Sequence, residues 1–150
     1  MKMSPQLVKI QNNMQPGVIT QTGFLGSDKR KLIDIIAHDE ETLQSLNLDI
    51  NILVNRLEYF KIEGLKGLGE PITVDKKWEV IINEARGFIP CPYEDGVFRK
   101  RNIQIKNMNN KKVINYSDLS IHLIEKHHFF QGLGASYRLE PKEIKIVLEL

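Results

Sequence analysis

The chain has 150 residues, of which 41% are hydrophobic and 27% charged, and this is the composition of a single globular domain with a buried core. Its formal net charge of +2 is too small to indicate an anionic partner by itself. The one cysteine, Cys91, excludes an intramolecular disulfide and therefore a disulfide-stapled secreted scaffold. No apolar run approaches the roughly 20 residues that a membrane-spanning helix needs, and no signal peptide is indicated. We expect a cytoplasmic protein with no membrane partner.

Residues 1–22 are rich in glutamine and asparagine and contain Pro5 and Pro16, with few apolar residues. This composition predicts a flexible or extended N-terminal arm. Residues 23–150 are expected to form one α+β domain.

The first part of that domain, about residues 27–64, is predicted to be helical. Apolar residues at helical spacing favour a helix from near Lys29 to about His38 and a short one from Asp39 through Leu46. Asp49 is suited to cap a third helix, which Gly64 would end.

The second part, about residues 71–150, begins with apolar residues at alternating positions, which predict strands at 72–74 and 78–82. Residues 86–96 are expected to form an irregular loop, and two strands at 103–106 and 113–116 to form a hairpin. Ser117 or Asp118 would cap a helix that ends at Gly132, and residues 141–148 favour a helix, with a strand as the alternative. The fold class is therefore α+β, with a helical N-terminal subdomain followed by an antiparallel sheet on which a helix packs.

One functional hypothesis concerns the segment 43–57, whose apolar spacing is typical of a helix-turn-helix. The same spacing also suits three-helix packing without any nucleic acid. If the segment is a helix-turn-helix, its second helix would offer polar side chains to the bases and phosphates of nucleic acid. These residues are Asn51, Asn55, Arg56 and Lys61.

The predicted hairpin is basic, because there is no acidic residue between Gly96 and Tyr116. Concentrated on one ribbon, its positive charge would bind phosphates, although lysines on an edge strand also serve to prevent aggregation. The basic residues are Arg99, Lys100, Arg101, Lys106, Lys111 and Lys112. Together with the helices, this hairpin favours a non-enzymatic protein that binds nucleic acid; a protein partner or self-association stays open.

The alternative hypothesis is a metal or small-molecule site built from Cys91, His122 and His127. Thiolate and imidazole are zinc ligands, and Asp95 or Glu94 would supply a fourth. The spacing of the histidines argues against it, since residues i and i+5 lie about 140° apart on an ideal helix. A catalytic version requires a histidine that lowers the pKa of the Cys91 thiol. The sequence does not decide whether the protein is an enzyme, and zinc is the one cofactor that it suggests.

The runs RGFIPCPYEDG (86–96) and SDLSIHLIEKHHFFQGLGASYRLEP (117–141) resemble a small family of conserved bacterial proteins without an assigned function. The resemblance extends from about Gly23 to the C-terminus. It implies no activity, ligand or site residue.

Overall fold

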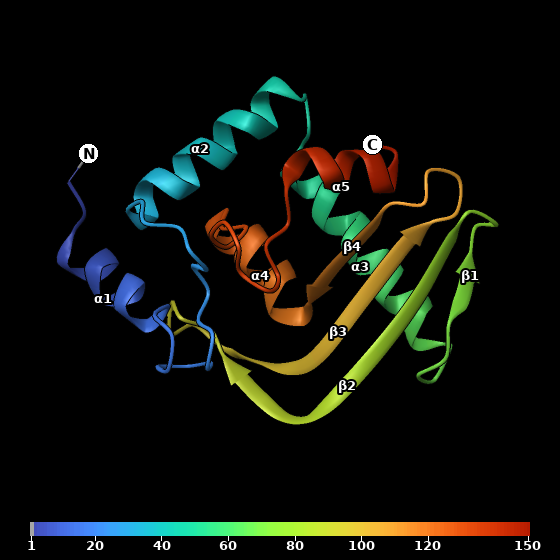
Figure 1. Ribbon diagram of the computed structural model, residues 1–150, viewed down its shortest axis with the longest axis horizontal. Coiled ribbons are helices and arrows are strands. Elements are labelled where there is room, and N and C mark those ends of the chain that lie inside the picture. The colour runs from blue at the N-terminus through green and yellow to red at the C-terminus, as the bar shows by residue number, and fades with distance from the viewer. Residues whose placement is uncertain (1) are drawn as a thin grey trace.

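The computed structural model describes residues 2–150, and within them five helices accompany a four-stranded antiparallel sheet (Figure 1). This confirms the predicted α+β class. The elements in chain order are α1 (Pro5–Asn13), α2 (Leu32–Ser45), α3 (Ile50–Leu65), β1 (Ile72–Val74), β2 (Trp78–Pro90), β3 (Val97–Asn107), β4 (Val113–Ser117), α4 (Asp118–His127) and α5 (Pro141–Leu148). None of the helices described is both long enough and apolar enough to cross a membrane.

The sheet is a meander in which each strand pairs with the next one in the chain. The register pairs Val80 with Ile105, and Ile105 with Ile114, so that apolar side chains from neighbouring strands meet. All three are buried, because helices α3, α4 and α5 pack against the strands.

A β-bulge bends the long β2–β3 hairpin. The pairing of the two strands is interrupted between Ala85 and Phe88, and Gly87 takes a φ of 91°, which suits a residue without a side chain. Beyond the bulge, Phe88 pairs with Arg99 and the ladder continues to Pro90. The expected loop over residues 86–96 is therefore shorter, because residues 86–90 belong to β2 and only residues 91–96 connect the strands.

The core consists of two clusters, and α4 lies between them. Ile121 and Ile124 of α4 join the larger cluster, with the sheet, α3 and α5. Leu119 and Leu123 join the second cluster, with residues of α1 and α2. Because α4 buries apolar side chains in both clusters, packing on its two sides fixes its position.

Part of the expected N-terminal arm, Pro5–Asn13, forms helix α1, and Met1 of the arm lies outside the described residues. The Ser4 side chain accepts a hydrogen bond from the Leu7 amide, and Pro5 occupies the first turn, as at many helix starts. Ile10 and Met14 are buried in the second cluster. Scattered apolar residues in a polar stretch were a weak sequence signal, and the burial of Ile10 and Met14 with residues of α2 and α4 supplies the missing stabilisation.

Two expected helix boundaries were also wrong. A single helix, α2, replaces the two that were predicted to meet at Asp39. Helix α4 ends at His127, with the left-handed residue His128 as its cap, rather than at Gly132. Gly132 serves a different purpose: its amide donates to the Phe24 carbonyl, and its Cα lies so near the Leu25 backbone that a side chain would not fit. The helix predicted for residues 141–148 is confirmed, and the alternative of a strand is excluded.

Asp39 stays inside α2 because it forms a buried ion pair with Arg138. The two guanidinium bonds to the carboxylate measure 2.5 and 2.8 Å, and Arg138 also donates to the Gln131 carbonyl at 2.9 Å. This pair joins α2 to the segment that leads into α5. The guanidinium of Arg138 is thereby engaged on both sides, by Asp39 and by the Gln131 carbonyl.

We predict that Asp39→Ala destabilises the fold by about 3–5 kcal/mol, because it leaves the buried Arg138 guanidinium without its main partner. The measurement is urea unfolding followed by circular dichroism. Glu41→Ala, which removes an exposed carboxylate from the same helix, is the matched control and should change stability little. An equal effect of the two substitutions would contradict the role given to the pair.

Candidate metal centre

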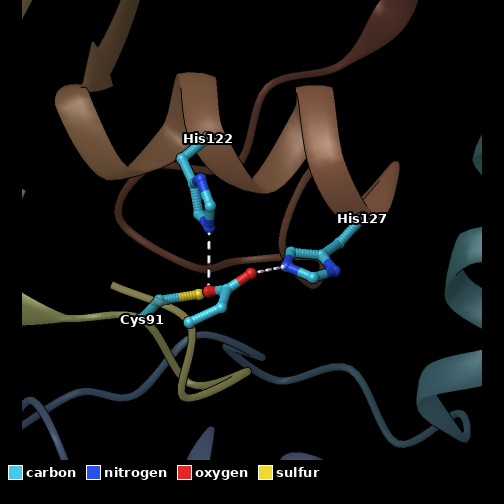
Figure 2. A group of neighbouring side chains, drawn as sticks. Cys91, His122 and His127 are labelled. Carbon is cyan, nitrogen blue, oxygen red and sulfur yellow. Dashed lines mark hydrogen bonds and ion pairs between the residues drawn. The ribbon is translucent and has the colours of Figure 1, made fainter. Parts of the chain in front are cut away.

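The loop that closes the β2–β3 hairpin lies beside α4, and it brings Cys91 next to two histidines (Figure 2). One ligand atom from each of Cys91, Asp95, His122 and His127 lies within 4.8 Å of the other three. All three residues expected to form the site therefore meet in space, with Asp95 as the fourth member. Residues from two segments that are about 30 positions apart in the chain build the cluster.

The short loop itself is held by backbone hydrogen bonds. The Cys91 amide donates to the Gly96 carbonyl at 2.9 Å, and the Glu94 amide donates to the Cys91 carbonyl at 2.9 Å. The Tyr93 amide also points to the Cys91 sulfur, at 3.4 Å. These contacts fold the loop back on itself and so bring Asp95 close to Cys91.

Asp95 links the two histidines. One of its carboxylate oxygens lies 2.9 Å from Nε2 of His122, and the other lies 2.6 Å from Nε2 of His127. A carboxylate only accepts, so each Nε2 carries a proton and donates it in this arrangement. The same two nitrogens would be the ligand atoms of the histidines for a metal ion bound between the four side chains.

The spacing of the histidines does not prevent their convergence. On an ideal helix their Cα atoms are separated by about 140° and about 7.5 Å of rise. His127 is the last residue of α4, and the rings reach toward the loop from the two sides, with their centroids 5.4 Å apart. The histidine side chains are therefore long enough for both rings to reach Asp95, although their Cα atoms lie on different sides of the helix.

Two aromatic side chains fix the imidazole rings. Tyr93 stacks on His127, with ring centroids 3.6 Å apart and planes within 3° of parallel. Phe98 packs against His122, with centroids 4.5 Å apart. Sequence reasoning gave these residues no such role, because their contact with α4 arises only when the hairpin bends. Their positions restrict ring rotation, which reduces the entropy that a bound ligand would cost.

The electrostatic state of the cluster follows from its hydrogen bonds. Burial would raise the pKa of Asp95, but hydrogen bonds with Cys91, His122 and His127 outweigh it and hold the pKa well below its usual range. Burial and the neighbouring Asp95 carboxylate raise the pKa of the Cys91 thiol to about 12. The catalytic-thiol hypothesis required a lowered pKa, and the shift has the opposite sign.

Glu94, the other residue considered as a fourth ligand, faces α1 instead. Lys9 forms an ion pair with it at 3.2 Å, and the Asn13 amide lies 3.4 Å from it. Asn13 also donates to the Pro92 carbonyl at 2.9 Å. The N-terminal helix thus braces the outer side of the loop.

The residues proposed to read nucleic acid in the helical segment are arranged differently from a helix-turn-helix. Helix α2 packs mainly against α1 and α5, whereas α3 packs mainly against the sheet and α4. Arg56 lies over the rings of Tyr59, Phe60 and Trp78. Lys61 is largely buried and is paired with Glu58 and Asp118. Asn51 and Asn55 are exposed.

The charges of the basic hairpin are partly neutralised by carboxylates from elsewhere in the fold. Glu84 pairs with both Arg99 and Arg101, and Lys112 pairs with Glu143. Three lysines of the set, Lys100, Lys106 and Lys111, have no carboxylate within 4.0 Å among the described residues. Nucleic-acid binding stays a prediction, with less free charge to support it than the sequence suggested.

Comparison of the chain with models of known protein families, with curated proteins and with solved structures gives no match. The chemistry of the cluster therefore has to carry the functional argument.

We predict that Cys91 of the metal-free protein reacts slowly with iodoacetamide at neutral pH. A thiol whose pKa lies near 12 has about a thousandfold less thiolate than one at the usual value of 9.0, and the residue is also buried. The measurement is the alkylation rate, followed by mass spectrometry, with and without urea at an unfolding concentration. Equal rates in the folded and the unfolded chain would contradict the assignment.

Proposed function

We propose that this protein binds a divalent transition-metal ion, Zn²⁺, through Cys91, Asp95, His122 and His127. The observation that carries the proposal is the convergence of four ligand atoms within 4.8 Å of one another. A thiolate, a carboxylate and two imidazoles form a donor set that zinc accepts in tetrahedral coordination, whereas Mg²⁺ and Ca²⁺ prefer oxygen donors alone.

The size of the cluster supports the proposal. Ligand atoms at ordinary zinc distances of about 2.0–2.3 Å would lie about 3.4–3.8 Å from one another in a tetrahedron. The present cluster needs only small movements of the side chains to reach that arrangement, because its atoms are already within 4.8 Å. Tyr93 and Phe98 hold the imidazoles in place, as supporting contacts do around many metal ligands.

The position of the cluster indicates what the metal would do for the fold. Cys91 and Asp95 belong to the hairpin loop, and the histidines belong to α4, so one ion would join these two elements. The Asp95 side chain is 37% exposed, which leaves a route for the ion from solvent. With four ligands from the chain, the proposed role is structural and not catalytic.

We predict that the protein binds one Zn²⁺ per chain and that the ion raises its melting temperature. Cys91→Ala and His127→Ala should each weaken binding by about two orders of magnitude or more, because each removes a direct ligand. The measurements are isothermal titration calorimetry and the visible spectrum of the Co²⁺ form, whose thiolate charge-transfer band should vanish in Cys91→Ala.

His128→Asn is the matched control for the histidine variant. His128 neighbours His127 but pairs with Glu40, and asparagine tolerates its left-handed backbone. This variant should bind zinc as tightly as the unaltered chain. Stoichiometric binding that persists in both Cys91→Ala and His127→Ala would exclude the proposed site.

We further predict that zinc binding strengthens as the pH rises from 5 to 8 and releases protons. The thiol, with its pKa of about 12, is protonated before the metal binds, and the imidazoles must be neutral to bind it. Calorimetry in buffers of different ionisation enthalpy measures the proton count. An affinity that is independent of pH would argue against thiolate and imidazole ligands.

A further inference from the structure

A second candidate site lies on the concave side of the bent hairpin, apart from the metal cluster. It is a cavity of about 510 Å³, a volume in the range of small-molecule sites. Strands β2 and β3 line it near the bulge, and the N-terminal end of α4, the segment 20–24 and residues 131–137 complete its walls. Figure 1 shows the hairpin curving around α4, and the cavity is lined by residues of both strands next to the bulge.

The cavity has apolar walls. The side chains of Phe24 and Leu119 are buried in the second core cluster and also line the cavity, as does Ile89 from the strand beyond the bulge. Tyr137 adds a half-buried ring. Such walls suit the body of an aliphatic or aromatic molecule, because its burial removes apolar surface from water.

The charged groups of the cavity are mostly positive. Arg99, Lys100 and Arg101 line it, and Glu84 is the one carboxylate among its lining residues. Arg99 and Arg101 both pair with Glu84. Arg101 also pairs with Asp118, at 3.3 Å. Lys100 has no carboxylate within 4.0 Å among the described residues. An anionic group at this rim would therefore meet an uncompensated ammonium and an exposed guanidinium.

We propose that this cavity binds a small organic anion that has an apolar or aromatic body. The anionic group lies toward Lys100 and Arg99, and the apolar body lies against Phe24 and Leu119. The proposal is independent of the metal, since none of the four proposed ligands lines this cavity.

The experiment uses 8-anilinonaphthalene-1-sulfonate as the probe, because it combines a sulfonate with aromatic rings. Its fluorescence is titrated against the full chain, and amide chemical shifts locate the bound molecule. The expected result is one saturable site, with shifts at residues 83–85 and 99–102. Lys100→Glu should weaken binding at least tenfold, and Ala85→Trp should abolish it by filling the cavity.

Lys111→Glu is the matched control, because it reverses an exposed lysine of the next turn, outside the cavity. It should bind the probe as the unaltered chain does. Shifts spread over the surface, or equal affinities for the Lys100→Glu and Lys111→Glu variants, would overturn the proposal. Lys100 is exposed, so its substitution tests the site even if Ala85→Trp does not fold.

Discussion

The burial of α4 on two sides is the constraint on which the rest of the structure depends. Leu119 and Leu123 contact residues of α1 and α2, and Ile121 and Ile124 contact the sheet and its covering helices. Burial of each such side chain contributes about 1.5–3 kcal/mol, so the helix cannot rotate without exposing one of the two sets. The direction in which His122 and His127 point is therefore decided by the packing of apolar neighbours.

The hairpin supplies the other half of the candidate centre, and the bulge makes this possible. A straight continuation of β2 and β3 would carry Cys91 and Asp95 away from α4, whereas the bend at Gly87 turns the strands around it. The same bend encloses the cavity beside Leu119 and Asn102. One irregularity in the ladder thus positions both the metal ligands and the second candidate site, in keeping with the frequency of bulges near functional sites.

Charge patterns that suggested nucleic acid have a different local explanation in the folded chain. Glu84 pairs with two arginines across the hairpin and offsets one of their two charges, and Asp118 approaches both Arg101 and Lys61. The carboxylates come from segments that the basic run does not contain, so a count along the sequence overstated the free positive charge. Partly buried pairs of this kind serve the packing of α3 and α4 more than the attraction of a distant phosphate.

The sequence by itself determined the α+β class, the strands at 72–74 and 113–116 and the start of α4. It also identified Cys91, His122 and His127 as candidate ligands. Helix-capping residues, the spacing of apolar residues and the chemistry of side chains are local properties, so they can be read from the sequence. Only the tertiary structure decided that these three residues meet, and that Asp95 rather than Glu94 joins them. It also decided that α1 is ordered and that α2 is continuous through Asp39, since both depend on partners far along the chain. Residues that meet from distant segments are not separated by any fixed number of positions, so local sequence patterns could not reveal these contacts.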